Sequence, residues 1–562
     1  MESSPLVDVL IAGAGPCGLL LANDLARRRG GLKLRVIDAA EGPSVHTKAM
    51  AVQIKTLEIY DDLGLSERAI EEGLVLKGTR VVWGRGQEVQ MALRQIPDQS
   101  PLPGMLIFPQ FQNENMLIDS LERYGRKGLV EYSTKLVGFE KVTRAASSGG
   151  EDHILCHCER GGEAFSVKTR FLVGAEGAHS VVRKTLGLAF DGKKFEEEFL
   201  LCDCEIEKAD AAESGGRYLE PGDMLSFLDG TLFVAFPYKW GGYRIVMTRS
   251  EERMGKEATM EEVQKVCDLL PTKLAVKNPR WISPFRIHSR VVDQFGDLER
   301  VFLVGDAAHI HSPAGGQGMN TGLQDSYNLG WKLWLACQSK ASAALIKSFS
   351  LERQPIGRTL IRTTDTAFSA VAGSSVMFRM LRSVMFSALG RKFLLPEVER
   401  RIPQLVAQLW ISYRSGPLAL SVLPRKFFGS WPLQAGDRLP FLKLEKGTTT
   451  LDLVRGPHFT VLFLASSTAA AEELCSEVVL KQLEVLKEGA GLKSFLLSCH
   501  QDCRGPPGIE SLAIADPADF KRKFGGITDG MLLVRPDKYI GYMEALGMKS
   551  RLSEYLERLF KP

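Results

Sequence analysis

An α/β fold is predicted for this chain of 562 residues by three features of its sequence. A short apolar run near the N-terminus leads through a glycine-rich turn into a helical pattern, which is the order of a parallel βαβ unit. Two later segments repeat the order of strand, glycine turn and helix. Alternating apolar residues in the middle predict an antiparallel layer, and strands alternating with helices near the C-terminus predict a further α/β domain.

The first glycine turn is the most specific local motif. Residues 6–12 form an apolar strand pattern, residues 19–29 have helical apolar spacing, and residues 33–39 form the next predicted strand. Between the first two lies a complete G-x-G-x-x-G, made of Gly13, Ala14, Gly15, Pro16, Cys17 and Gly18. Such glycines allow a tight turn and close approach of a pyrophosphate to a helix N-terminus. Asp38, twenty residues after Gly18, is placed to accept hydrogen bonds from a ribose. The motif predicts a Rossmann-type site for FAD or NAD and does not choose between them.

Two further segments follow the same plan. One runs from a strand pattern at residues 171–173 into a glycine turn that contains Glu176. The other runs from a strand pattern at residues 301–304 into Gly305 and Asp306, and then into a loop that precedes a helical pattern. That loop contains Gly316, Gly318, Met319 and Asn320.

With these three segments in this order, residues 6–335 resemble the class A FAD-dependent aromatic hydroxylases, the family of para-hydroxybenzoate and phenol hydroxylases. The resemblance implies a Rossmann-type FAD-binding domain interleaved with an antiparallel β substrate domain. It implies that Asp306 binds the ribityl chain of FAD, and that the loop at residues 315–320 directs backbone N–H groups at the flavin, an oxyanion-hole type of stabilisation. Gln110 matches a flavin-contacting glutamine, and Leu136 matches an adenine-contacting backbone position.

The chain departs from that family at three places. Glu176 stands where relatives carry Asp, and Lys48 replaces an arginine, which keeps the charge but loses the planar fork. Met50 stands where phenol hydroxylases carry an Asp that activates the phenol, so we expect that base to be missing. Lys48, near the flavin or its phosphates, and Pro313 are the candidate catalytic residues. A plain surface lysine is the alternative for Lys48.

The predicted substrate layer comprises approximately residues 75–110 and 190–290, inserted into an FAD-binding domain of residues 1–415. Two apolar runs joined by Lys239, Trp240 and Gly241 predict an antiparallel hairpin. Candidate substrate contacts are Met50, Phe236, Tyr238 and Tyr243, with ordinary sheet packing as the alternative for each aromatic residue.

The C-terminal part is predicted as a connector at residues 416–437 and a domain at residues 438–562. Its strand and helix order, with Val534, Arg535, Pro536 and Asp537, resembles the thioredoxin-like domain of phenol-hydroxylase-type enzymes. No C-x-x-C follows the strand at residues 459–464. We therefore expect a redox-inactive domain that serves packing or contacts within a homodimer.

Composition narrows the function classes. A net charge of +4, with 25% charged residues, gives no indication of a nucleic-acid partner. We see no secretory signal, no uncharged run long enough for a membrane span, and no paired cysteine spacing typical of zinc. A cytoplasmic protein with reduced thiols and without a metal is expected.

The function that the resemblance implies is an FAD-dependent monooxygenase. NADPH or NADH would reduce FAD, and reduced flavin with O2 would form a flavin hydroperoxide that hydroxylates a small aromatic, phenolic or polyketide-like substrate. The alternatives are a flavin-fold binding protein without catalysis, or another flavin oxidoreductase such as a halogenase or reductase. The sequence leaves open the substrate, NADH versus NADPH, epoxidation or oxygen insertion instead of hydroxylation, and the oligomeric state.

Overall fold

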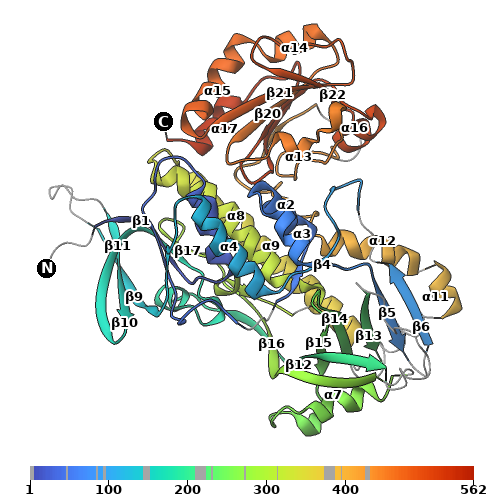
Figure 1. The fold of residues 1–562 in the computed structure, drawn as a ribbon. Coiled ribbons are helices and arrows are strands. Elements are labelled where there is room, and N and C mark those ends of the chain that lie inside the picture. The colour runs from blue at the N-terminus through green and yellow to red at the C-terminus, as the bar shows by residue number, and fades with distance from the viewer. Residues whose placement is uncertain are drawn as a thin grey trace.

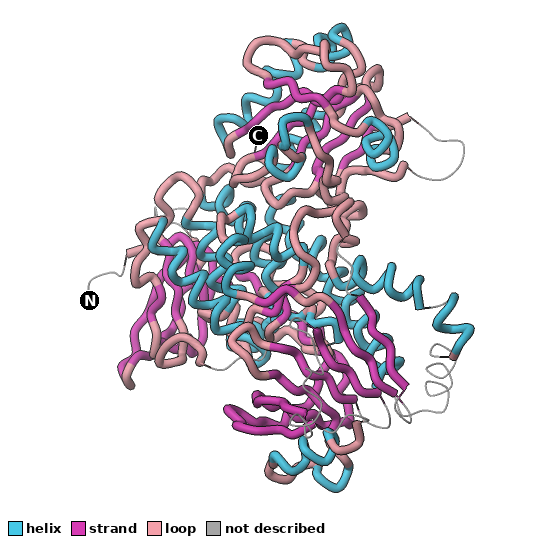
Figure 2. The backbone as a smooth tube through the Cα atoms, turned by 45° about the vertical axis from the view of Figure 1, so that its right-hand side comes forward, coloured by secondary structure: helices cyan, strands magenta, loops and turns pink. Residues whose placement is uncertain are grey.

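The computed structural model describes residues 5–45, 49–83, 87–92, 96–143, 152–208, 223–228, 232–270, 274–312, 314–372, 387–393, 395–424 and 431–561. It has a central α/β body, a large sheet at one end and a separate α/β domain at the other, as Figure 2 shows. In Figure 1 the C-terminal domain, coloured orange to red, lies against helices α8 and α9 of the central body.

The central body is built on a seven-stranded sheet. Its order is β8-β2-β1-β11-β10-β9, with β17 paired to β11, and the pairs β8-β2, β2-β1, β1-β11 and β11-β17 are parallel. The strands are β1 (Val7–Ala12), β2 (Leu34–Ile37), β8 (Val130–Glu131), β9 (Thr134–Val142), β10 (His153–Arg160), β11 (Glu163–Gly174) and β17 (Val301–Leu303). Five of the six residues of β1 are buried, as expected of a strand with helices and other strands around it.

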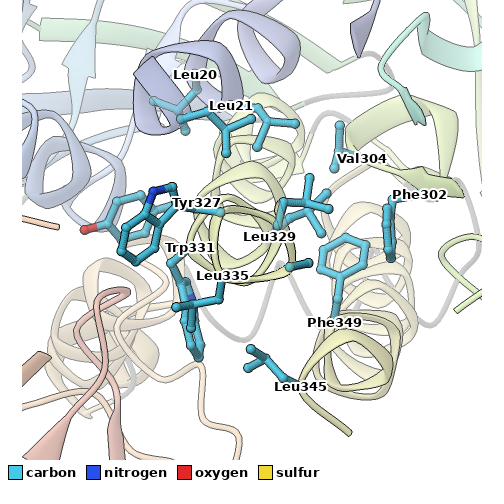
Figure 3. Close-up of a cluster of buried hydrophobic side chains, with 14 of the residues drawn as sticks. Leu20, Leu21, Phe302, Val304, Tyr327, Leu329, Trp331, Leu335, Leu345 and Phe349 are labelled. Atoms are coloured by element: carbon cyan, nitrogen blue, oxygen red, sulfur yellow. The ribbon is translucent and has the colours of Figure 1, made fainter. Parts of the chain in front are cut away.

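Helices pack around this sheet. They are α1 (Pro16–Ala26), α2 (Ile54–Asp62), α3 (Ser66–Glu72), α4 (Gln110–Arg123), α5 (Val181–Thr185), α8 (Gly318–Cys337) and α9 (Ala343–Ala372). Helices α11 (Ala388–Phe393) and α12 (Leu395–Val406) lie apart from this sheet, at the right of Figure 1. Helix α8 is buried along most of its length because the apolar side chains of α1, β17 and α9 surround it (Figure 3). Leu20 of α1 and Phe349 of α9 lie on different sides of α8 in that view. Helix α8 therefore packs against α1, which begins at the first glycine turn, and also against β17 and α9.

The second sheet has eight strands in the order β18-β16-β12-β15-β14-β13-β5-β6. Its strands are β5 (Gly78–Trp83), β6 (Gln87–Ala92), β12 (Asp191–Lys208), β13 (Asp223–Leu228), β14 (Leu232–Pro237), β15 (Tyr243–Thr248), β16 (Leu274–Val291) and β18 (His309–Ile310), and α7 (Met260–Cys267) packs on it. All pairs are antiparallel except β13 with β5. The hairpin predicted around Trp240 is confirmed as β14 and β15. A small third sheet consists of β3 (Ala51–Val52), β7 (Leu106–Ile107) and β4 (Leu74–Val75). These strands occur where the chain passes from one large sheet to the other, since β3 and β4 lie between β2 and β5 in the sequence, and β7 lies between β6 and β8.

The C-terminal domain contains a mixed six-stranded sheet in the order β19-β24-β23-β20-β21-β22. Its elements are β19 (Leu420–Val422), α13 (Thr450–Leu453), β20 (Phe459–Leu464), α14 (Thr468–Leu474), α15 (Glu477–Gly489), β21 (Leu492–Ser498), β22 (Glu510–Ala513), α16 (Pro517–Phe524), β23 (Gly530–Val534), β24 (Ile540–Ala545) and α17 (Leu552–Leu559). The sheet and its helices confirm the predicted α/β domain, and the parallel β20-β21 pair with the antiparallel β23-β24 pair makes the sheet mixed. Strand β19 falls within the residues predicted as a connector, and it pairs with β24. It was not predicted because three residues between Pro and Gly positions give little strand signal.

Among the described residues, no helix combines the length and the apolar character that crossing a membrane requires. The same residues contain no group of three or more His, Cys, Asp or Glu side chains arranged to hold a metal ion.

Candidate active site

The first glycine turn connects β1 to α1 and is shaped by its three glycines. Gly13 has φ +105°, and a Cβ there would lie 2.4 Å from the carbonyl oxygen of Ala175. A Cβ on Gly18 would lie 2.0 Å from the carbonyl oxygen of Gly13. Gly15 differs, because a Cβ there would meet nothing within 4 Å, and no side chain caps the start of α1. The turn therefore leaves room for an anion at an uncapped helix N-terminus.

Asp38 lies directly beside this turn. Its carboxylate accepts hydrogen bonds from the backbone N–H of Ala14 at 2.6 Å and of Ala40 at 2.8 Å. The backbone N–H of Thr134 donates to the carbonyl of Asp38 at 2.8 Å, and buried Leu136 follows two residues later in β9. This backbone hydrogen bond thus joins the predicted ribose contact, at the end of β2, to the start of β9, the strand of the predicted adenine contact.

The second glycine segment packs on the first. The backbone N–H of Ala175 donates to Ala12 at 2.7 Å, and the backbone nitrogen of Glu176 would lie 2.9 Å from a Cβ on Gly13. The carboxylate of Glu176 accepts from the Ser180 hydroxyl at 2.7 Å and from two N–H groups at the start of α5 at 3.1 Å. Burial raises the pKa of this carboxyl, against the effect of those hydrogen bonds. The side chain of Glu176 therefore caps α5, and its backbone borders the glycine turn.

The third segment closes over the start of α1. Gly305 has φ +59°, and Cβ atoms on Gly305 and Gly322 would lie 2.6 and 2.5 Å from the sulfur of Cys17. Asp306 is exposed, although Gly305 before it and Ala307 after it are buried. The structure thus brings all three glycine segments together around α1, and Asp306 lies at the surface of that cluster.

The loop before α8 is fixed to the small sheet. Gly315 and Gly316 have φ +76° and +62°, and a Cβ on Gly316 would lie 2.7 Å from the Cβ of Ala51. The Asn320 side chain donates to the carbonyls of Ala51 and Gly316, both at 2.8 Å, and accepts from the N–H of Gln53 at 2.8 Å. Asn320 therefore holds the loop in place, while Gly318 and half-buried Met319 begin α8.

Gln110 begins α4, shortly after β7 of the small sheet. Its side-chain amide donates to Glu114 at 2.8 Å, and its backbone N–H donates to Ala49 at 2.9 Å. Burial raises the pKa of Glu114. Gln110 is thus near the segment that precedes β3. Lys48, in the same segment, and Pro313 lie outside the described residues.

An apolar cluster lies next to this loop. Met50 and Tyr238 are buried together with Leu76 and Ile107, and Phe236 packs partly buried against them. The residue after Met50, Ala51, accepts the hydrogen bond from Asn320, so the cluster begins where the glycine loop is anchored. Tyr238 stacks on Trp240, with ring centroids 4.4 Å apart. Tyr243 packs elsewhere, against the cluster that contains Val263 and Cys267 of α7. We call the group of Met50, Phe236 and Tyr238 the apolar wall.

An ion pair between buried Arg244 and half-buried Asp203 fixes Tyr238, and neither residue was predicted from the sequence. The Tyr238 hydroxyl donates to Asp203 at 3.0 Å, and Arg244 donates to the same carboxylate at 2.7 and 2.6 Å. Burial and the nearby Asp203 raise the pKa of Tyr238, although Arg244 opposes this, so the phenol stays protonated at neutral pH. Asp203 and Arg244 are paired across β12 and β15, two strands that β13 and β14 separate in the chain, so no local sequence pattern specifies their contact.

A cavity of about 190 Å³ between α2 and the C-terminal domain is a different feature. The acidic residues that α2 contributes are Glu58, Asp61 and Asp62. They pair with Arg438, Arg455 at 2.7 Å and Lys538 at 2.8 Å, respectively. Paired charges at a domain boundary indicate a structural role, so we do not assign the active site here.

The glycine segments fit a bound dinucleotide. Space beside Gly15, an uncapped helix N-terminus and Asp38 at the end of β2 supply the three features that pyrophosphate and ribose require. Comparison with known proteins identifies the dinucleotide. The model of the FAD binding domain family matches residues 6–364.

Two relatives cover most of the chain. A flavin-dependent monooxygenase of Mycobacteroides abscessus is 33% identical over 83% of this chain and 90% of the relative. The 6-methylpretetramide 4-monooxygenase of Streptomyces rimosus is 32% identical over 98% of this chain and 92% of the relative. Among solved structures, an anhydrotetracycline hydroxylase from Streptomyces rimosus superposes with a TM-score of 0.72 at 25% identity, over 99% of this chain and 100% of the other. The glycine segments, the family match and these relatives together place the chain in the class A FAD-dependent aromatic hydroxylase family, and it is an FAD-dependent monooxygenase.

Proposed function

We propose that this monooxygenase hydroxylates a multi-ring, polyketide-type aromatic substrate that lies against the apolar wall. The observation that supports this most directly is the position of Met50, adjacent in the chain to Ala51, which anchors the glycine loop before α8. A substrate on this wall would lie beside the part of FAD that the loop binds. A relative named 6-methylpretetramide 4-monooxygenase, with 98% of this chain covered, supports the multi-ring class.

The cofactor assignments follow the same geometry. We propose that the turn with Gly13 and Gly15 binds the pyrophosphate, that Asp38 binds the ribose, and that Asp306 with the loop before α8 binds the flavin half. Bound FAD, once reduced by NADPH or NADH, supplies the activation of O2 and the transfer of one oxygen atom. The chain's own contribution is orientation and the exclusion of water. Lys48 and Pro313 stay predicted catalytic residues on the sequence alone.

The wall also bears on how the substrate is activated. Among the described residues of the wall, Met50 and Phe236 carry no titratable group, and the raised pKa of Tyr238 keeps its hydroxyl protonated. The protonated hydroxyl of Tyr238 donates a hydrogen bond to Asp203, so Tyr238 does not act as the base that takes a proton from a substrate. We therefore propose that the wall orients an aromatic ring that is already electron-rich, such as a polyphenol or its anion.

The ten cysteines, all unpaired in the structure, support a reducing compartment such as the cytoplasm as the site of action.

A screen tests the proposed substrate class. Purified enzyme is offered simple phenols, quinols and multi-ring polyketides, and nicotinamide oxidation is followed together with product mass. Multi-ring substrates should give coupled turnover, with one oxygen atom gained per nicotinamide oxidised. Efficient coupled turnover of simple phenols alone would contradict the proposal, and nicotinamide oxidation that yields only peroxide would count as no turnover.

A further inference from the structure

One buried carboxylate holds both ends of the turn that carries Asp306. Asp325, on α8, is fully buried and accepts a hydrogen bond from the backbone N–H of Gly305 at 3.1 Å. The same oxygen lies 2.8 Å from Nε2 of His309. Gly305 precedes Asp306 and His309 follows it by three residues, so Asp325 binds both ends of the turn, while Asp306 within the turn is exposed.

The second oxygen of Asp325 binds α9. Nε of Arg353 donates to it at 2.7 Å, and the same guanidinium donates to the carbonyl of Thr321 at 3.1 Å. Burial alone raises the pKa of Asp325, but Arg353 and His309 more than offset this and lower it, so the carboxylate stays charged. Replacing a buried ion pair by apolar residues is often neutral or stabilising, so the charge is better explained by the geometry that it imposes than by stability.

The residue beside Arg353 reaches the C-terminal domain. Glu352 accepts hydrogen bonds from both terminal nitrogens of Arg535, at 2.6 and 2.9 Å, and all of these side chains are fully buried. Arg535 is held in turn by Asp537 at 3.0 Å. Two consecutive residues of α9 therefore connect the turn of Asp306 to the C-terminal domain, which has no C-x-x-C after β20 to give it a redox role.

We propose that Asp325 is a positioning residue for FAD, which sets the turn that presents Asp306, and that Arg535 of the C-terminal domain supports this turn through Glu352 and Arg353. The C-terminal domain then contributes to cofactor retention without touching the cofactor. This inference rests on the proposed contact between Asp306 and the flavin half of FAD.

The test compares the release of FAD from four holoenzymes. Asp325→Asn removes the charge but keeps the side-chain shape. The matched control is Glu262→Gln, since Glu262 is a buried carboxylate of α7, the helix that packs on the second sheet, and it pairs with fully buried Arg249 at 2.9 Å, away from the Asp306 turn. Asp306→Ala removes the proposed contact with FAD itself. Arg535→Lys removes the planar guanidinium that donates two hydrogen bonds to Glu352 from the C-terminal domain. Release into flavin-free buffer is followed by flavin fluorescence, with unfolding measured in parallel.

We expect Asp325→Asn to weaken FAD binding by about tenfold, which is about 1.4 kcal/mol. Arg535→Lys should weaken it by roughly threefold, and Glu262→Gln should stay near wild type even if its unfolding midpoint falls. Wild-type retention in Asp325→Asn together with loss in Asp306→Ala would overturn this inference and leave the proposed site intact. Equal loss in Glu262→Gln and Asp325→Asn would also overturn it, because the effect would then be general destabilisation.

Three further outcomes are separable. Wild-type retention in Asp306→Ala would refute the proposed flavin contact. If Asp325→Asn does not fold, Arg353→Lys replaces it, because lysine keeps the charge but loses the bond geometry. Wild-type retention of FAD in folded Arg353→Lys would then overturn the proposal, and wild-type retention in Arg535→Lys would remove the C-terminal domain from it.

Discussion

Substitution of Gly15 should weaken the binding of FAD without lowering the stability of the apoprotein. A Cβ at Gly15 would meet no protein atom within 4 Å, and the backbone there is at φ −73° and ψ −178°, which alanine adopts without strain. Gly15→Ala should therefore leave the apoprotein as stable as wild type, or more stable by about 0.4–1 kcal/mol through the smaller entropy of the unfolded chain.

The same methyl group should interfere with FAD. If the pyrophosphate approaches the backbone at Gly15, the added Cβ occupies part of that space and lengthens the hydrogen bonds from the start of α1. Hydrogen bonds to charged groups contribute about 1.5–3 kcal/mol each, so the loss of one predicts FAD binding that is roughly 10- to 150-fold weaker. The expected result is a stable apoprotein that binds FAD poorly.

The assay is a titration of apoprotein with FAD, followed by flavin fluorescence, beside thermal unfolding of the same sample. Gly505→Ala is the control, because a Cβ there would come no closer than 3.4 Å to any atom beyond its chain neighbours, and Gly505 lies in the C-terminal domain, away from the glycine turn. Wild-type FAD affinity in Gly15→Ala would refute the placement of the pyrophosphate. An equal loss of affinity in Gly505→Ala would show that the effect is not local.

Three further results are expected. Gly18→Ala should fail to fold or lose several kcal/mol of unfolding free energy, roughly 3 or more, because its Cβ would lie 2.0 Å from the backbone oxygen of Gly13; a normal unfolding transition would contradict this. Tyr238→Leu should raise KM for an aromatic substrate by roughly 2- to 10-fold without changing FAD content, and an unchanged KM would remove Tyr238 from the wall. Burial alone raises the pKa of Glu352, but Arg535 and its neighbours bring it from 4.5 to about 2, so its contribution to stability is present above pH 4.5 and is lost as the pH falls toward 2. The loss should amount to at most about 3 kcal/mol, and acid titration of Glu352→Gln should lack this part of the pH dependence.

The glycine segments could be predicted because their requirements are local. Gly13 and Gly18 are needed by the backbone geometry of one short turn, and the flanking strand and helix patterns lie within the same forty residues. The parallel sheet, the hairpin of β14 and β15 and the C-terminal α/β domain were predicted for the same reason. Strand β19 was not, since its pairing with β24 depends on contacts more than a hundred residues away.

The roles of individual side chains were harder to predict. The cofactor contact of Glu176 stays a prediction, and the structure adds a role that was not predicted, since its carboxylate caps α5 and binds Ser180. Asp325 was not singled out, because Gln324 and Ser326 flank it and the local pattern does not distinguish it from a solvent-exposed helix position. Its partner Arg353 lies in another helix, and no sequence spacing specifies that meeting.

Turnover under isotopically heavy O2 tests most directly that this chain is an FAD-dependent monooxygenase of aromatic substrates. Holoenzyme with NADPH or NADH and the best substrate of the screen should yield a product that carries one heavy oxygen atom, with consumption of one nicotinamide and one O2 per product. A product whose new oxygen comes from water, or nicotinamide oxidation without any oxygenated product from any aromatic substrate, would contradict it.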